Sequence, residues 1–318
     1  MVKRQVSIAF IGAGYMTAEH IKVFADIPEV VISGIYSRTR EKAEKISSQY
    51  SGMIVCDSIE ELYTSLKPEL VVISVPELSA ESVCLEAFKY PWTCLIEKPV
   101  GYNYGNAEII LESAKKNNSN AFVALNRRHH SSTINVLKDM ATVDQPRVIH
   151  IYDQENPTAA LLAGQPALVV ENWMYANAIH MIDYFNILGR GKIIEIQNII
   201  RWNPDNPNFV LSKLTYDSGD LGIYEAVWNA PGPWAVVVNT QKKRWEIRPL
   251  EQAVVQLYGS RKQEPFEIHE WDKSFKPGLR FQAQQAVNAI NGMEHTLPTL
   301  DDAMESMKLV KAFYVGSK

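Results

Sequence analysis

The chain is poor in several features that mark particular classes of protein. Its 318 residues include only three cysteines, Cys56, Cys84 and Cys94. Their spacing suits neither a metal site nor a disulfide framework, so we expect buried, reduced thiols and no bound metal. The net charge is −4 and no block of basic residues is present, which argues against nucleic acid or an anionic membrane surface as a partner. Internal repeats and low-complexity segments are absent as well.

Long apolar runs are also missing. No run is long enough to span a bilayer, and residues 1–5 lead directly into a predicted strand without the apolar region of a signal peptide. We therefore expect a soluble cytoplasmic protein. Because 46% of the 318 residues are hydrophobic, the chain can form a large core, and its length predicts two domains.

The first 125 residues alternate between strand and helix patterns. Strands are predicted at 6–11, 30–36, 53–55, 70–75, 93–97 and 121–125, with helices at 17–24, 41–49, 58–66, 79–88 and 103–117. The run at 70–75 is almost entirely apolar, which is typical of a parallel sheet covered on both faces. This alternation predicts a doubly wound α/β domain over residues 1–125.

From residue 126 onward the pattern changes. Strands are predicted at 147–154, 193–200, 209–216, 221–228, 234–239 and 243–247, and helices at 176–188, 281–291 and 301–314. Runs of strands beside helices indicate a second, α+β domain over residues 126–318. We expect helix 281–291 to close this domain, helix 301–314 to pack on the first domain, and the irregular stretch 154–172 to form a substrate lid.

A glycine turn joins the first strand to the first helix. Gly12 permits a tight turn, and Gly14 lets the backbone approach a pyrophosphate at the positive N-terminus of the helix. The third position of this fingerprint holds Thr17 in place of Gly or Ala. Strand, turn and helix in this order favour a dinucleotide-binding loop, with a plain strand-to-helix turn as the alternative.

The second strand ends in Ser37-Arg38-Thr39. An NAD site usually has Asp or Glu here to bind the ribose hydroxyls, and neither is present. Two hydroxyls and a guanidinium suit a 2′-phosphate instead, so these residues favour NADP over NAD. A solvated helix N-terminus is the alternative, because a helix is predicted to follow.

A lysine stands at the end of the fifth strand. Thr93–Glu97 is a predicted buried strand, and Pro99 keeps Lys98 out of the helical region. Ligands of open α/β sheets bind outside the carboxyl ends of the strands, where a partly desolvated lysine can move protons near neutral pH. The alternative is a solvated Lys98 paired with Glu97. Pro76 stands at another strand end near the expected cofactor.

Together these residues resemble the Gfo/Idh/MocA oxidoreductase family. The resemblance covers essentially the whole chain and rests on Gly12-Ala13-Gly14-Tyr15-Met16, Ser37-Arg38-Thr39, Glu97-Lys98-Pro99, Asn126-Arg127-Arg128 and His180-Met181-Ile182-Asp183. It implies a Rossmann domain followed by a domain with an open mixed or antiparallel sheet, and association through that sheet into a homodimer or homotetramer. It also implies hydride transfer between NADP or NAD and a hydroxyl or keto group of a sugar, nucleotide sugar or related polyol.

The resemblance further implies roles for individual residues. Lys98 would hydrogen-bond or protonate the substrate oxygen, and His180 would assist from a helix. The implied cofactor contacts are Gly12, Ala13, Gly14, Tyr15, Met16, Ser37, Arg38, Thr39, Ser74, Val75, Pro76, Glu97, Lys98 and Asn126. The implied substrate contacts are Lys98, Arg128, Trp173, Tyr175, Asn177, His180 and Asp183. Buried packing is the alternative for the two aromatic residues.

Position 176 departs from the family pattern. Many family dehydrogenases carry an Asp four residues before this His, where a carboxylate would orient the imidazole, and this chain has Ala176. The departure keeps a second hypothesis open, a dinucleotide-binding sensor or assembly protein without hydride turnover. A hydrolase that uses a bound nicotinamide for transient redox chemistry, also known in the family, is a third.

Assembly is predicted from the apolar strand at 234–239. Val236 and Val238 would need cover if they lay on an exposed sheet face. We therefore expect a dimer or tetramer built on that face.

Overall fold

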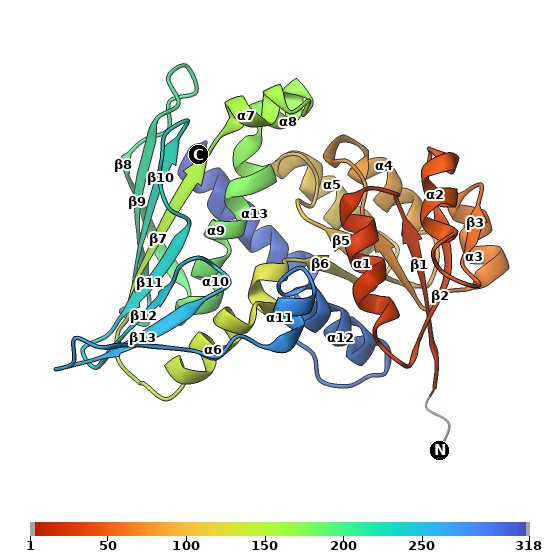
Figure 1. Ribbon diagram of the computed structural model, residues 1–318. Coiled ribbons are helices and arrows are strands. Elements are labelled where there is room, and N and C mark those ends of the chain that lie inside the picture. The colour runs from red at the N-terminus through yellow and green to blue at the C-terminus, as the bar shows by residue number, and fades with distance from the viewer. Residues whose placement is uncertain (1–3, 316–318) are drawn as a thin grey trace. The chain divides into compact units, whose positions relative to one another are not determined.

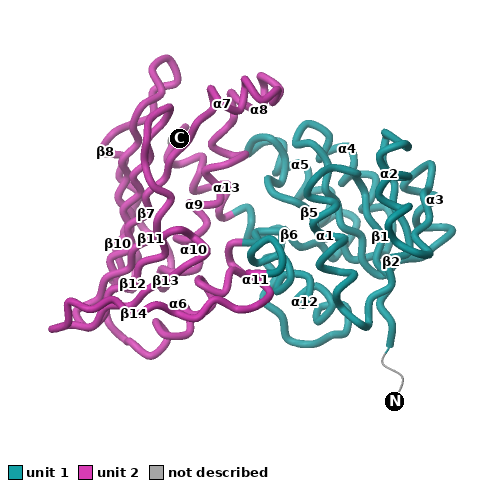
Figure 2. The backbone as a smooth tube through the Cα atoms, viewed as in Figure 1, with its two compact units in different colours: residues 1–126, 274–304 teal, residues 127–273, 305–318 magenta. Residues whose placement is uncertain are grey.

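The computed structural model describes residues 4–315, and the chain divides into two compact units (Figure 2). Unit 1 contains the chain up to Asn126 together with Ser274–Met304, and unit 2 contains Arg127–Lys273 and the chain from Glu305. Residues 1–3, which we expected to lead into the first strand, lie outside the described residues.

Unit 1 is built on a parallel sheet of six strands in the order β3-β2-β1-β4-β5-β6 (Figure 1). The strands are β1 (Val6–Ile11), β2 (Val30–Tyr36), β3 (Ile54–Cys56), β4 (Leu70–Ile73), β5 (Thr93–Glu97) and β6 (Ala121–Ala124). The chain starts in β1, moves outward to β3 and returns to β4 on the other side of β1, so the strand order reverses between β1 and β4. This confirms the predicted doubly wound sheet.

Five helices connect these strands: α1 (Tyr15–Ala25), α2 (Arg40–Ser47), α3 (Ile59–Leu66), α4 (Glu77–Ala87) and α5 (Tyr104–Lys116). Capping residues in the sequence set some of their ends. The Ser58 side chain accepts the backbone N–H of Glu61 at 2.9 Å and so caps α3. Asn103 caps α5 in the same way through the N–H of Asn106.

One helix of unit 1 comes from far along the chain. We expected residues 281–291 to close the second domain, and this is wrong: α12 (Leu279–Ile290) packs against α1. Four of its side chains join the core that surrounds Phe10 and Phe24, namely Leu279, Ala283, Ala286 and Val287. An apolar helical stripe shows that a face is buried, but it does not show which surface covers that face.

The last helix also differs from expectation. We expected residues 301–314 to pack on the first domain. Only the start of α13 (Leu300–Tyr314) belongs to unit 1, and the rest belongs to unit 2. There the Phe313 ring stacks on Tyr224 with centroids 4.8 Å apart.

Unit 2 is built on a mixed sheet of eight strands in the order β14-β13-β12-β11-β7-β10-β9-β8. The strands are β7 (Val148–Glu155), β8 (Ile193–Ile200), β9 (Phe209–Tyr216), β10 (Leu221–Trp228), β11 (Ala235–Asn239), β12 (Lys243–Ile247), β13 (Ala253–Leu257) and β14 (Gln263–Pro265). β7 pairs with β10 in parallel, and the other neighbouring pairs are antiparallel. Helices α9, α10 and α13 lie on one face of this sheet (Figure 1). The predicted α+β unit with an open mixed sheet is confirmed, whereas β13 and β14 were not predicted.

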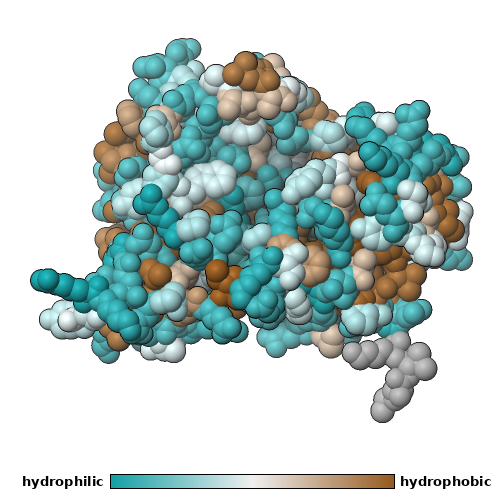
Figure 3. All heavy atoms as spheres, viewed as in Figure 1, coloured by the Kyte–Doolittle hydropathy of each residue, from teal (hydrophilic) through white to brown (hydrophobic). Residues whose placement is uncertain are grey.

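The remaining helical segments are short. They are η1 (Asn126–His129), α6 (Ser131–Met140), α7 (Pro157–Leu162), α8 (Ala167–Glu171), η2 (Met174–Ala178), α9 (Ile179–Ile182), α10 (Tyr184–Leu188) and α11 (Glu270–Ser274). The expectation of an irregular segment at 154–172 is wrong, because α7 and α8 lie within it. Pro157, which suggested a loop, occupies the start of α7, and the Asn156 side chain caps that helix. Leu161, Leu162 and Leu168 are exposed on α7 and α8, where Figure 3 shows a hydrophobic patch.

The faces of the large sheet also correct a prediction. Val236 and Val238, expected to be exposed, are 0% and 1% exposed within the single chain. They pair with Ile151 and Ile149 of β7, which are buried as well. Every residue from Ala235 to Val238 is apolar, so alternation could not show which face of this strand is buried.

The structure bears on two features that are scarce in the sequence, cysteine and long apolar runs. The three cysteines are buried free thiols, and burial raises the pKa of Cys84 to about 12. Between residues 4 and 315, no helix has the length and apolar content needed to cross a membrane.

Candidate cofactor and substrate sites

The predicted cofactor residues of unit 1 lie along one edge of its sheet. Residues 12–16 follow β1, 37–39 follow β2, 74–76 follow β4, 97–98 end β5, and Asn126 follows β6. Because parallel strands present their carboxyl ends at the same edge, these stretches flank the crevice where the strand order reverses. The structure therefore brings together residues that the sequence placed more than a hundred positions apart.

The turn after β1 requires glycine at Gly12. Its φ is +112°, and a Cβ there would lie 1.9 Å from the carbonyl oxygen of Ser74. Thr17 explains the departure from the glycine fingerprint, since its hydroxyl accepts the Gly14 N–H and donates to that same Ser74 oxygen, each at 3.3 Å. A Cβ at Gly14 would meet no atom within 4 Å, so this backbone faces open space. These features fit a dinucleotide pyrophosphate at the start of α1.

The turn after β2 presents one engaged and one available arginine. Arg40 hydrogen-bonds Glu44 at 2.8 Å and also pairs with Asp57. Arg38 is exposed, and within residues 4–315 no side chain forms a hydrogen bond or ion pair with it. Its guanidinium can therefore bind an anion without breaking an existing contact.

The end of β5 is held from α1 by a residue that sequence reasoning missed. The Nε2 atom of His20 lies 2.6 Å from Oε1 of Glu97, and the His20 side chain is 1% exposed. Lys98 follows, half-buried, with a cis peptide bond to Pro99. Nothing in the sequence around His20 marks it, because only the packing of α1 on the sheet brings it to Glu97.

In unit 2 the predicted histidine lies on an irregular helical stretch. η2 is a π-helical turn that runs into α9, so the chain carries extra residues per turn just before His180. Such turns are frequent at functional sites. Ala176 is buried at 6% exposure and Tyr175 at 4%, whereas His180 and Trp173 are half-buried.

Two of the predicted substrate residues bind each other. Arg128 donates two hydrogen bonds to Asp183, Nε to Oδ2 at 2.8 Å and Nη2 to Oδ1 at 2.7 Å. The Ser306 hydroxyl also donates to Oδ1, at 2.6 Å. This mostly buried pair ties η1, α13 and the end of α9 together, while the substrate roles of both residues stay predictions.

Sequence reasoning missed a pair of acidic residues on β7. Asp153 and Glu155 are 1% and 0% exposed and point to the same side of the sheet as the buried Ile149 and Ile151. The Tyr224 hydroxyl donates to Asp153 Oδ2 at 2.7 Å. Asn177, a predicted substrate residue, donates from Nδ2 to Glu155 Oε2 at 2.8 Å. Strand alternation was the available signal, since it places both carboxyl groups inside.

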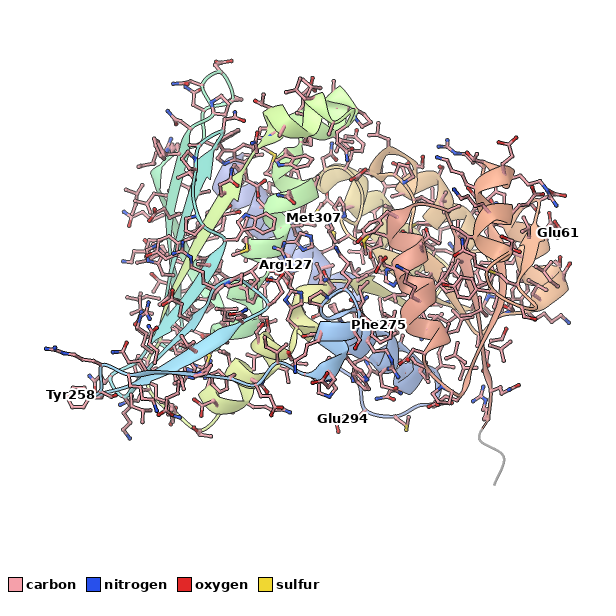
Figure 4. All side chains as sticks on the ribbon, viewed as in Figure 1. Glu61, Arg127, Tyr258, Phe275, Glu294 and Met307 are labelled. Carbon is pink, nitrogen blue, oxygen red and sulfur yellow. The ribbon has the colours of Figure 1, made fainter. Side chains whose placement is uncertain are left out.

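Burial dominates the protonation of this pair. It raises the pKa of Asp153 from 3.8 to about 6, against the opposing hydrogen bond from Tyr224. Burial and then the charge of Asp153 raise the pKa of Glu155 well above its usual value. The nearest cation is Arg127, which Figure 4 labels and whose guanidinium lies 4.3 Å from the centre of the Trp234 ring.

Comparison with known proteins identifies the fold of unit 1. Residues 6–125 match the sequence model of the GFO_IDH_MocA family, described as an oxidoreductase family with an NAD-binding Rossmann fold. The first 125 residues, which form the parallel sheet of unit 1, are therefore similar to the NAD-binding domain of the Gfo/Idh/MocA oxidoreductases. The matched range ends at the last strand of the parallel sheet and includes every cofactor residue predicted in unit 1 except Asn126.

Similarity to known proteins extends beyond the matched range. A 4-carboxy-2-hydroxymuconate-6-semialdehyde dehydrogenase from Sphingobium sp. is 21% identical over 71% of this chain and 73% of its own. A dehydrogenase from Chromobacterium violaceum has the same fold, with a TM-score of 0.81 at 16% identity over 98% of this chain and 94% of its own. A UDP-N-acetylglucosamine 3-dehydrogenase from Acidithiobacillus ferrooxidans reaches a TM-score of 0.78 at 15% identity over 98% and 97% of the two chains.

Proposed function

We propose that this protein transfers a hydride between NADP or NAD and a hydroxyl or keto carbon of a sugar, nucleotide sugar or related polyol. The observation that carries the proposal is the position of Lys98, at the carboxyl end of β5 on the same sheet edge as the Gly12 turn. The family of unit 1 is one of oxidoreductases, and one relative in fold is a dehydrogenase of a nucleotide sugar.

In this proposal, side chains of the protein donate or accept the proton of the reaction. The nicotinamide, when bound, supplies or takes up the hydride. A carbonyl that gains a hydride also gains a proton on its oxygen, so a donor must face that oxygen. Lys98 would hydrogen-bond or protonate it, with His180 assisting. His20 would keep the end of β5 in place by holding Glu97.

We propose NADP as the preferred cofactor. The turn after β2 has no carboxylate for the ribose hydroxyls, and Arg38 has no partner among the described side chains. Ser37 and Thr39 add two hydroxyls to the same turn. A 2′-phosphate would gain charge-assisted hydrogen bonds there, whereas a ribose hydroxyl would gain less.

Ala176 supports a second candidate function, dinucleotide binding without turnover. Position 176, four residues before His180, holds Ala where a carboxylate could orient the imidazole. A protein that binds NADP tightly and serves as a sensor or assembly partner would tolerate this loss. A nicotinamide-dependent hydrolase stays a third candidate.

Identification of co-purified small molecules tests the proposal most directly. We expect mass spectrometry of molecules released from the purified protein to find NADP(H), together with a polyhydroxylated compound. That compound and a panel of sugars and nucleotide sugars are then assayed by NADPH absorbance. Turnover of any of them supports the oxidoreductase, tight NADPH binding with no turnover supports the sensor, and failure to bind either cofactor contradicts both.

We also propose a cytoplasmic homodimer or homotetramer that forms through the large sheet. The face opposite α9 and α13 carries exposed apolar side chains, among them Val148 at 37% and Phe209 at 50% exposure. A second copy of the chain would cover them. Light scattering should give a multiple of 35.9 kDa, which Phe209→Lys should reduce. A monomer at micromolar concentration would contradict the assembly.

A further inference from the structure

The carboxyl pair on β7 leaves part of its hydrogen-bonding capacity unused. Tyr224 satisfies Oδ2 of Asp153, and Asn177 satisfies Oε2 of Glu155. The other two oxygens, Asp153 Oδ1 and Glu155 Oε1, are buried and receive no hydrogen bond from any described residue. Burying two neighbouring ionised carboxylates away from water, each with an oxygen that lacks a hydrogen bond, costs free energy. One proton shared between Asp153 Oδ1 and Glu155 Oε1 gives both oxygens a hydrogen-bond partner.

The surrounding charges agree with a single proton on the pair. Arg127 is the cation that faces it, from η1, and Arg127 itself contacts the Trp234 ring and the Met181 sulfur, which lies 3.4 Å from Nη1. The pair with one proton carries one negative charge, which Arg127 balances. The other facing groups are neutral: Tyr224 on β10, Tyr314 on α13, and Trp173 and Asn177 at η2.

The hydroxyl chain behind the pair runs in one direction. Because Tyr224 donates to Asp153, the Tyr314 hydroxyl donates to Tyr224, 2.7 Å away, and the Trp228 indole donates to Tyr314 at 3.3 Å. Burial raises the pKa of both tyrosines, so these hydroxyls keep their protons. Asp153 Oδ2 is therefore fixed as an acceptor, which leaves Oδ1 to bind the shared proton.

A third open group lies beside Glu155. The indole N–H of Trp173 is buried and directed at this carboxyl group, without a hydrogen bond of normal geometry to any described residue. This donor lies beside Glu155 Oε1, whose second lone pair is not used by the shared proton, so the two suit a ligand atom that can both accept and donate. A hydroxyl group has that property, whereas a carboxylate or phosphate cannot donate to Glu155.

We propose that Asp153 and Glu155 share one proton and form, with the Trp173 indole N–H, a subsite for an uncharged hydroxyl group of the substrate. The hydroxyl oxygen accepts from Trp173 Nε1, and its hydrogen is donated to Glu155 Oε1. The subsite deepens the proposed function and rests on it, since it narrows the substrate to one that places a neutral hydroxyl here. It disfavours anionic groups because the pair already carries a negative charge.

The first experiment needs no substrate. Infrared difference spectroscopy of the NADPH-loaded protein near neutral pH should show the C=O stretch of a protonated buried carboxyl group, shifted in D₂O. Glu155→Gln should remove the band. Tyr224→Phe, which keeps both carboxyl groups, should shift it and covers the case in which Glu155→Gln fails to fold. The matched control Glu225→Gln changes a carboxyl on the opposite sheet face and should leave the band unchanged. Absence of the band in the wild type overturns the shared proton.

The second experiment tests the ligand. In the NADPH-loaded protein, calorimetry compares a polyol that binds, its analogues with single hydroxyls removed, and the sugar acid of the same skeleton. Loss of one particular hydroxyl should weaken binding to the wild type about 10–100-fold and have little further effect in Glu155→Gln. The acid should bind more weakly than the polyol, and Glu155→Gln should narrow that gap.

The two proposals fail in distinguishable ways. Equal losses in the wild type and Glu155→Gln for every removed hydroxyl, or no preference for polyol over acid, overturn the subsite. Failure to find any polyol that binds does so as well. Polyol binding with the expected Glu155 dependence but no hydride transfer upholds the subsite and removes the proposed oxidoreductase activity.

Discussion

The carboxyl edge of the unit 1 sheet and the covered face of the unit 2 sheet differ in what forms them: backbone groups dominate the first, and buried side chains the second. At the unit 1 edge the backbone dominates, through the positive φ of Gly12, the open space beside the Gly14 Cα and the ends of parallel strands. Its nearby charges, such as Arg38 and the Arg40–Glu44 pair, are exposed. Unit 2 also contains charged side chains that are buried and pair between separate elements, as in Arg128–Asp183.

This difference shows how the two parts of such a protein are specified. A backbone site depends on a few local residues and suits a ligand with a constant shape, such as a dinucleotide. A site of buried side chains depends on every element that contributes one, so small sequence changes alter which ligand it accepts. Ala176 on η2 and the carboxyl pair on β7 belong to a region of buried side chains of this second kind.

The largest effect is expected at Lys98, whose side chain would do chemistry at the backbone-built edge. Lys98→Ala should fold, bind NADPH through the Gly12 turn and Arg38, and lose about 10²–10⁴-fold in the rate of hydride transfer. Single-turnover absorbance of NADPH with a working substrate measures this. Lys98→Arg should not restore the rate, because a guanidinium is larger and does not release a proton near neutral pH.

The rate loss in His180→Ala, a variant of unit 2, is to be compared with that in Lys98→Ala. His180→Ala should cost less than Lys98→Ala, because Ala176 stands where family dehydrogenases carry the Asp expected to orient this imidazole. Hydride transfer at the wild-type rate in Lys98→Ala would instead assign Lys98 to a solvated strand end.

A buried pair of unit 2 should matter far more to stability than an exposed pair of unit 1. Asp183→Asn leaves the Arg128 guanidinium, with 15% side-chain exposure, without its counter-ion, which should cost about 3–5 kcal/mol in the free energy of unfolding. The control Glu44→Gln breaks the exposed Arg40 pair and should cost at most about 1 kcal/mol. Urea unfolding measures both. Equal losses would remove the distinction drawn between the two regions.

Replacing the exposed Arg38 should change only the preference of the protein for NADPH over NADH. Arg38→Ala should weaken NADPH binding by about 1.5–3 kcal/mol, the usual contribution of hydrogen bonds to charged groups, and leave NADH binding nearly unchanged. Fluorescence titration of both cofactors tests this. If the wild type binds NADH as tightly as NADPH, the preference for NADP is wrong.

The last prediction concerns the pH dependence of stability. The Asp153 pKa is raised from 3.8 to about 6 in the folded chain, so the folded state holds this proton more tightly than the unfolded state. Its contribution to stability is therefore complete below pH 3.8 and is lost as the pH rises through about 6.

Asp153→Asn cannot lose this proton, so the variant should gain stability relative to the wild type between about pH 4 and pH 7. Urea unfolding at both values gives the difference. A constant difference across that range would show that folding does not change the protonation of Asp153 there, which contradicts the raised pKa.

Much of unit 1 could be predicted from the sequence. β1, β2 and β5 have the predicted bounds, and Gly12, Ser37 and Pro76 lie at the sheet edge where strand ends were expected. In unit 2 the strands were largely predicted, but the buried face of β11 was not, because its residues are apolar on both sides. Asn156 and Pro157 lie in a stretch that the sequence predicts to be irregular, but Asn156 caps α7 and Pro157 is its first residue.

By itself the sequence determined the alternation of strands and helices, the glycine turn and the residues at the strand ends. These depend on local backbone preference and short-range periodicity, so they need no knowledge of distant contacts. Only the tertiary structure decided that α12 completes unit 1, that His20 holds Glu97, and that Asp153 and Glu155 lie against Asn177 and Tyr224. Hydrophobic burial has no direction, so the chain encodes which faces are covered without encoding, in any local pattern, what covers them.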